Sequence, residues 1–169
     1  ILAPDSGDYK FILVELQTQW RQLGIAVNVQ LADPYTIGAD YLQGRGFDVL
    51  VYELSVGGDP DVYAYWHSSQ INVKGGLNFA NYRSGVADDA LASARARLDP
   101  SLRLAKYKKF YEQWLKDTPA VALYQPYLSY ATIRTSTALE QGHPVVDAVT
   151  RFRDVDRWAV SETTVMTTR

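Results

Sequence analysis

The chain has 169 residues, of which 47% are hydrophobic and 21% are charged, a composition typical of a folded protein and not of a disordered one. The net charge of −2 gives no reason to expect nucleic acid or an anionic membrane surface as a partner, and no apolar run is long enough to span a membrane. Cysteine is absent, which excludes disulfides, thiolate metal sites and cysteine nucleophiles.

The first third of the chain alternates between signals for strands and signals for helices. Alternating or continuous apolar runs predict strands, and apolar residues at helical spacing predict helices. The pair Asp33-Pro34 is a helix-start signal, and a glycine follows each helical stretch. The predicted strands are 1–4, 25–31 and 49–52, and the predicted helices are about 6–23 and 33–43.

This order of elements predicts a parallel sheet. Two successive crossovers through helices bring each new strand back in the same direction, with right-handed connections. The strand at 1–4 must then be paired on both sides. Because a full domain would not begin so abruptly, we expect that an upstream part has been cut away.

The stretch 47–70 is the one around which we expect a binding site. Glycine and proline at 57–60 end the third strand, so the chain leaves the sheet at the carboxyl edge of that strand. Ligands of open α/β sheets bind just outside such edges. Aromatic residues follow at 63, 65 and 66. The chain has 12 tyrosines and 4 tryptophans, which suit a polar or sugar-like ligand, although most of them are better explained as core residues.

The rest of the chain predicts a loop, two helices and a stranded end. The loop at 71–85 is polar and rich in glycine and asparagine. The apolar face of the first helix is expected to carry Ala87, Leu91, Ala94 and Leu98, and the second helix is expected to turn Leu104, Tyr107, Tyr111, Trp114 and Leu115 inward. The predicted ranges are helices 86–98 and 99–117, strands 120–124 and 128–134, mostly loop at 135–150, a short closing strand within 152–160 and a loose tail at 161–169.

Three acidic residues, Glu53, Asp59 and Asp61, could serve a hydrolase. The HExxH, GxSxG and P-loop motifs are absent, however, and the two histidines are far apart in the sequence. We favour the interpretation that Asp59-Pro60-Asp61 forms a turn in which an aspartate caps the short helix that follows. Glu53 ends a buried strand, where an unpaired charge is costly, so it could meet a ligand amine or an arginine, or point to solvent.

Two further features near this edge have a functional and a structural interpretation. Gly57-Gly58 could hold an anion on its backbone amides, but a tight turn alone explains the pair. Trp66 and His67 could stack on a ligand, but a tryptophan that anchors the loop to the core is the simpler interpretation of Trp66.

Four stretches, taken in order, resemble the C-terminal part of the family 5 extracellular solute-binding proteins of ABC importers, the oligopeptide, dipeptide and nickel-binding type. They are FDVLVY (47–52) with GDPD (58–61) and HSSQ (67–70), NY (81–82) with 88–91, Asp99-Pro100 with Arg103, Tyr107 and 117–124, and 152–155 with Trp158. No single motif is strong, but the four in this order are specific together, and they extend over nearly the whole chain.

The resemblance implies an α/β fold, a lobe of the type II periplasmic-binding-protein kind with a mostly parallel sheet flanked by helices. Residues 1–160 would form an incomplete C-terminal lobe, without the N-terminal lobe and hinge strands of a two-lobed protein, and 161–169 a tail. It further implies an extracytoplasmic protein, periplasmic or lipid-anchored at the cell surface. Such a protein binds a small solute between its lobes and delivers it to the membrane permease, without catalysis, cofactor or metal.

The ligand-binding residues implied by the resemblance and by the strand edge are Glu53, Leu54, Ser55, Val56, Gly57, Asp59, Trp66 and His67. Peptide-binding members of the family often carry a tryptophan just after this strand and an aspartate three residues later that pairs with the ligand's amino group. The corresponding positions here are Leu54 and Gly57. Glu53 or Asp59 could replace the missing carboxylate, or the ligand could be neutral, such as an oligosaccharide. A sensor domain of the same fold is a further alternative.

Overall fold

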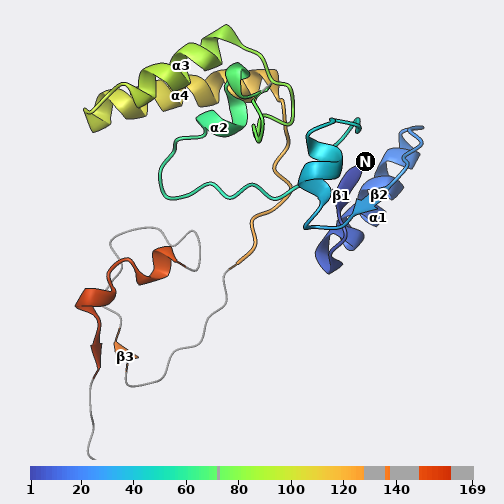
Figure 1. The fold of residues 1–169 in the computed structure, drawn as a ribbon, viewed down its shortest axis with the longest axis horizontal. Coiled ribbons are helices and arrows are strands. Elements are labelled where there is room, and N and C mark those ends of the chain that lie inside the picture. Colours follow the sequence, from blue (N-terminus) through green and yellow to red (C-terminus); the bar gives the residue numbers. More distant parts are fainter. Residues whose placement is uncertain (72, 128–135, 138–148, 161–169) are drawn as a thin grey trace, which may run out of the picture. The chain divides into compact units, whose positions relative to one another are not determined.

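The computed structural model describes residues 1–71, 73–127, 136–137 and 149–160 (Figure 1). The chain divides into two compact units, the first made of residues 1–55 and 62–119 and the second of residues 56–61 and 120–169. The predicted division into a lobe at 1–160 and a tail at 161–169 stays a prediction, because the tail lies outside the described residues.

The first unit contains a small parallel sheet with β1 in its middle. Strand β1 (Leu2–Pro4) pairs in parallel with β2 (Gln30–Ala32), and Leu2 forms a parallel bridge with Leu50 on its other side. The amide of Leu2 donates to the carbonyl of Val49 at 2.8 Å. The parallel direction of the strands and the pairing of β1 on both sides are therefore confirmed.

The strands are shorter than the sequence predicted. Residues 25–29 of the expected strand 25–31 have no regular structure, and the strand expected at 49–52 is reduced to the bridge at Leu50. A strand is defined by hydrogen bonds to a neighbour, and β1 offers only three residues for pairing. The apolar alternation at 25–31 does not bury one face either, since Ile25, Val29 and Leu31 are all exposed.

Two helical segments connect these strands. Helix α1 (Gly7–Gln22) buries Leu13 against Ala3 and Val51. The short helix expected after Asp33 is present as a turn followed by a π-helix, η1 (Gly38–Leu42). The carboxylate of Asp33 accepts the amide of Tyr35 at 2.8 Å, as its predicted role at a helix start requires.

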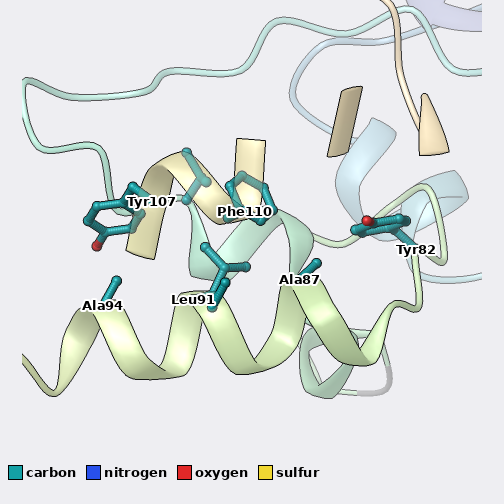
Figure 2. Packing of buried hydrophobic residues seen from close by; sticks show 8 residues of the cluster. Tyr82, Ala87, Leu91, Ala94, Tyr107 and Phe110 are labelled. Carbon is teal, nitrogen blue, oxygen red and sulfur yellow. The ribbon is translucent and has the colours of Figure 1, made fainter. Parts of the chain in front are cut away.

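Helices α3 (Gly85–Arg95) and α4 (Pro100–Asp117) pack side by side and carry the main hydrophobic cluster (Figure 2). The carboxylate of Asp99 accepts the amide of Leu102 at 2.8 Å and so caps α4. Figure 2 shows Tyr107 and Phe110 of α4 pointing toward Ala94, Leu91 and Ala87 of α3. The small alanines let the two helices approach closely.

The helices themselves are confirmed, but part of the expected inward face is wrong. Leu98 is 99% exposed because α3 ends before it, and Leu104, Tyr111 and Leu115 are exposed on α4. The buried face of α4 is formed by Tyr107 and Phe110. Helical spacing alone gives two overlapping apolar stripes on α4, and the position of α3 decides which one is buried.

The second unit has little regular structure among its described residues. Strand β3 (Ser136–Thr137) pairs antiparallel with β4 (Ala159–Val160), and two 3-10 turns, η3 (Thr150–Phe152) and η4 (Val155–Arg157), precede β4. The predicted closing strand at 152–160 is thus limited to its last two residues. The strand predicted at 120–124 is wrong: the segment has no regular structure and Val121 is 72% exposed. The strand predicted at 128–134 lies outside the described residues.

Candidate functional site

The chain leaves the sheet directly after Val51, earlier than the glycines and proline at 57–60 that were predicted to end the strand. Val51 is buried beside β1, whereas all residues from 52 to 59 are exposed. Glu53 and Leu54 therefore lie on the surface, and the carboxylate of Glu53 is not the buried charge that the sequence allowed for. Among the described residues Glu53 forms no ion pair, so its carboxylate is available to a cationic group of a ligand.

Strands β1 and β2 and the bridge at Leu50 are parallel, so the residues that follow them lie at the same edge of the sheet, and two of the acidic residues there already have partners. Asp5, which follows β1, forms an ion pair with Lys10 at 2.8 Å. Asp33, which follows β2, accepts backbone amides of the next turn. Glu53 is the acidic residue that follows the third strand, and it is the one of these three whose carboxylate is not used locally.

Val56, Gly57 and Asp59 are exposed and belong to the second unit. The carboxylate of Asp59 accepts the amide of Asp61 at 2.9 Å, which confirms the predicted turn. The expected cap on the following helix is wrong, because α2 (Tyr63–Trp66) begins after Val62 without a side-chain cap. A Cβ atom built on Gly57 would meet no atom within 4 Å, so this glycine does not serve a close approach of the backbone.

Ser55 is tied to helix α2. The hydroxyl of Tyr65 donates to the carbonyl oxygen of Ser55 at 2.9 Å. The ring of Tyr65 packs against the hydrophobic cluster of α3 and α4. Of the expected ligand-binding residues, Ser55 is therefore brought next to the helix that carries Trp66.

Trp66 and His67 are both engaged by neighbouring side chains. Trp66 packs edge to face with Tyr82 and with Trp114, at centroid distances of 6.4 Å and 5.3 Å, which fits the anchoring role. The ring of His67 stacks on Tyr63 with a centroid distance of 4.1 Å. Its Nδ1 accepts the amide of Ser69 at 3.1 Å. Their contact with a ligand stays a prediction.

Asn78 and Arg45 organise the loop behind α2, and neither was singled out from the sequence. Asn78 is fully buried; its side-chain amide donates to the carbonyls of His67 and Tyr82, at 3.1 Å and 3.0 Å, and its side-chain oxygen accepts the amide of Tyr82 at 3.0 Å. The guanidinium of Arg45 donates to the carbonyl of Asn78 at 2.7 Å. A loop without helix or strand can thus be held by a buried amide, and nothing in the local sequence distinguishes Asn78 from its neighbouring asparagines.

The hydroxyl of Tyr82 extends this network to the end of α4, where it donates to the carboxylate of Asp117 at 2.7 Å. Burial is the main cause that raises the pKa of Tyr82 to about 12, and the hydrogen bond to Asp117 adds to it. The hydroxyl is therefore a donor at neutral pH. Hydrogen bonds from Gln113 and then from Tyr82 hold the pKa of Asp117 below its ordinary value.

The described residues do not form a metal site or a membrane span. No group of three or more histidine or acidic side chains gathers within the part of the chain that the structure describes. In the same part, every helix is too short or too polar to cross a bilayer.

Comparison with solved structures shows what class of fold this is. The structure of the oligopeptide-binding protein AppA from Bacillus subtilis in complex with a nonapeptide matches with a TM-score of 0.67 and 23% identity, over 95% of this chain and 31% of that one. NikZ from Campylobacter jejuni in complex with Ni(L-His) matches with a TM-score of 0.60 and 22% identity, over 70% of this chain and 24% of that one. DppA from Helicobacter pylori in complex with the peptide STSA matches with a TM-score of 0.61 and 23% identity, over 70% and 23%. The fold is that of one part of a periplasmic binding protein.

Sequence comparison names a relative within that class. The oligopeptide-binding protein AppA of Bacillus subtilis is 31% identical to this chain over 117 residues, which are 68% of this chain and 21% of AppA. No family model matches the chain. The chain thus spans about a fifth of the length of its curated relative. The resemblance to family 5 solute-binding proteins that the sequence predicted is confirmed.

Proposed function

We propose that the chain is part of an extracytoplasmic solute-binding protein of an ABC importer. It would form one of two lobes that close on a peptide or a similar small solute, and the complete protein would deliver that solute to the membrane permease. The observation that carries this proposal is the homology to an oligopeptide-binding protein over two thirds of the chain, joined to a matching fold.

The candidate site supports a ligand-binding role at the strand edge. Residues 53–55 leave a buried strand at the carboxyl edge of a parallel sheet, the edge at which open α/β folds bind ligands. The free carboxylate of Glu53 suits an ammonium group, such as the amino terminus of a peptide. Leu54, Val56, Gly57 and Asp59 are exposed in the same stretch, and Trp66 and His67 follow on α2.

A ligand screen on the complete protein tests this function. Thermal unfolding would be followed with peptides of two to nine residues, with neutral oligosaccharides and with nickel-histidine, because a ligand that binds the native state raises the unfolding temperature. We expect a shift with peptides. A shift with oligosaccharides alone would favour the neutral-ligand alternative, and no shift with any of the three would contradict the proposal.

Substitution at Gly57 tests the ligand class more directly. Gly57→Asp would place a carboxylate where peptide-binding relatives often carry one, and the backbone there leaves room for it. If the ligand is a peptide, we expect tighter binding at neutral pH, on the order of tenfold for one added charge-assisted hydrogen bond. Gly58→Asp is the matched control, since a Cβ at Gly58 also meets no atom within 4 Å. Equal effects of both variants would point to net charge alone.

For the isolated chain we expect weak or absent ligand binding. Half of a clamp supplies half of the contacts, and these offset the loss of translational and rotational freedom poorly. Calorimetric titration of the chain with a nonapeptide, compared with the complete protein, measures the difference. Equally tight binding to both would contradict a two-lobed site.

Two other functions remain as alternatives with distinct tests. A hydrolase would need Glu53, Asp59 or Asp61, so turnover of a peptide or glycoside that is lost in Glu53→Gln or Asp59→Asn would support it. A sensor domain would bind the same ligands without delivering them. Ligand uptake by cells that depends on the neighbouring permease subunits distinguishes the transport role from a sensor.

A further inference from the structure

One hydrogen bond connects the candidate binding segment to helix α2, which follows it in the sequence. The chain leaves the first unit after Ser55 and returns to it at Val62, and the hydroxyl of Tyr65 joins the two ends by its 2.9 Å bond to the carbonyl of Ser55. The bond spans ten positions in the sequence and lies at the protein surface.

The donor is fixed by the packing of its own helix. Helix α2 has only four residues, but Val62 before it is 3% exposed and belongs to the hydrophobic cluster of α3 and α4. The rings of Tyr65 and Trp66 pack against the same cluster. The carbonyl of His67, at the end of α2, is held by the buried amide of Asn78. The Tyr65 hydroxyl is thus carried by a helix that is anchored at both ends.

The acceptor lies in a segment that has little else to hold it. Tyr52, at the start of the segment, contacts Phe79 edge to face with a centroid distance of 5.9 Å, but from residue 53 to residue 58 of the described chain Ser55 is the residue that makes a hydrogen bond, and all of these residues are exposed. The backbone before this segment is fixed, since the amide of Val51 donates to the carbonyl of Leu2 at 2.9 Å. The loss of the Tyr65 bond would therefore free the segment from residue 53 onward.

We propose that Tyr65 is a positioning residue, whose hydroxyl holds residues 53–55 in the orientation from which they bind the ligand. This inference rests on the proposed function as a solute-binding protein. Tyr65 does not itself need to touch the ligand. Its positioning role depends on a single atom, the hydroxyl oxygen, which is held by the packing of α2 in the first unit.

The test compares two tyrosine-to-phenylalanine variants of the same helix. Tyr65→Phe removes the hydroxyl and keeps the packed ring. Tyr63→Phe is the matched control, because it also removes one surface hydroxyl, which lies 3.3 Å from Ser69 Oγ and not on the segment. Amide ¹⁵N relaxation of the 169-residue chain without ligand gives the order parameters of both. In Tyr65→Phe we expect those of residues 53–55 to fall from about 0.85 to below about 0.6.

Stability and affinity separate positioning from a general loss of structure. The unfolding temperatures of the two variants are expected to agree within about 2 °C, since each loses one exposed hydrogen bond. Nonapeptide binding by the complete protein should weaken roughly three- to tenfold in Tyr65→Phe, through the added cost of ordering the segment, and should be unchanged in Tyr63→Phe.

Three results would overturn the inference: unchanged order parameters in Tyr65→Phe, the same loosening in Tyr63→Phe, or a loosened segment with unchanged nonapeptide affinity. If the unaltered complete protein does not bind a nonapeptide, the proposed peptide-binding function fails instead. The relaxation measurement still decides whether the hydroxyl orders the segment, because it is made without ligand.

Discussion

Two stretches without regular secondary structure lie on either side of α2, and they are held in different ways. Residues 73–84, after η2 (Ser68–Gln70), enclose the buried side chain of Asn78 and are fixed by its three hydrogen bonds and by Arg45. Residues 52–58, before α2, are exposed throughout and are held by a ring contact of Tyr52 with Phe79 and by the hydrogen bond from the Tyr65 hydroxyl to Ser55. A segment of this protein that lacks helix and strand can therefore be either firmly or loosely held by its contacts.

The two stretches therefore serve different purposes. The loop at 73–84 joins η2 to α3 and contributes the buried Tyr82 to the hydrophobic cluster, so it belongs to the structural framework of the first unit. The segment at 52–58 presents backbone groups and side chains to solvent, as a binding segment must. Segments that bind ligands come from the less stable parts of a fold, because they have to open and close.

The largest effect on stability is expected in the hydrophobic cluster of α3 and α4. Phe110 is completely buried between α3 and α4, so Phe110→Ala removes a full ring and leaves a cavity. We expect the free energy of unfolding to fall by about 3–5 kcal/mol. Leu104→Ala is the control on the same helix, since Leu104 is 65% exposed and should cost no more than about 0.5 kcal/mol. Urea denaturation of both variants measures the two values. A small loss at Phe110 would mean that the cluster is not the core.

Asn78 should come second. Asn78→Ala leaves the buried amide of Tyr82 and two carbonyls without their partner, and each such group costs about 1–3 kcal/mol. Because the loop can relax, we expect a loss of about 2–4 kcal/mol in the free energy of unfolding. The control Asn28→Ala changes an exposed side chain and should leave stability within about 0.5 kcal/mol of the original. If both asparagine variants lost the same free energy of unfolding, the buried amide of Asn78 would not be what holds residues 73–84 more firmly than residues 52–58.

A pair of glycines compares the two stretches directly. A Cβ on Gly76 would run into the backbone carbonyl of Gln70 and lie 2.9 Å from that of Val73, whereas a Cβ on Gly58 would meet no atom within 4 Å. Gly76→Ala should lower the free energy of unfolding by about 1–3 kcal/mol, the usual cost of overpacking. Gly58→Ala should be neutral or slightly stabilising, because it reduces the freedom of the unfolded chain. A costly Gly58→Ala would show that the exposed segment is packed more tightly than its surface position indicates.

The smallest effect concerns pH. Hydrogen bonds from Gln113 and Tyr82 lower the pKa of Asp117, so the folded state binds this proton less readily than the unfolded state. Its stabilising contribution is therefore fully present above the unfolded value of about 3.9 and is lost as the pH falls through the lower folded value. In Asp117→Asn the stability deficit should shrink as the pH is lowered below about 4. Asp89→Asn, an exposed position on α3, controls for the change in net charge. Parallel pH profiles of Asp117→Asn and the unaltered protein would contradict this account.

The sequence predicted those parts of the fold that local patterns determine. The caps at Asp33 and Asp99 are each formed by the residue that was expected to form them. The order of strands and helices correctly implied that β1 is paired on both sides. The inward position of Tyr107 was predicted correctly, whereas the end of α3 and the burial of Phe110 were missed, because both depend on where the neighbouring helix lies. The strand predicted at 120–124 failed because apolar alternation does not supply a hydrogen-bonded neighbour.

The sequence predicted which residues form the candidate site, but it did not predict how those residues are arranged in space. The turn at Asp59 follows from local chemistry, and so it was found. The Tyr65 bond to Ser55 and the burial of Asn78 join residues that are not neighbours in any local pattern, so no spacing rule identifies them. Tyr65 could be recognised from the sequence as one of the aromatic residues of the candidate stretch but not as the partner of Ser55, and Asn78 could be recognised only as one of several loop asparagines.

The central place of β1 in its sheet also constrains how the chain acquires its fold. In a growing chain β1 is made before β2 and before Leu50, so an apolar strand waits with both edges open until its two partners have been made. At typical synthesis rates of about 5–20 residues per second, this interval lasts several seconds. Helices α3 and α4 are sequence neighbours and can pair without closing a long loop. The slow and aggregation-prone step of folding is therefore expected at the sheet, and slower folding should follow from substitutions in β1 more than from equally destabilising ones in α3.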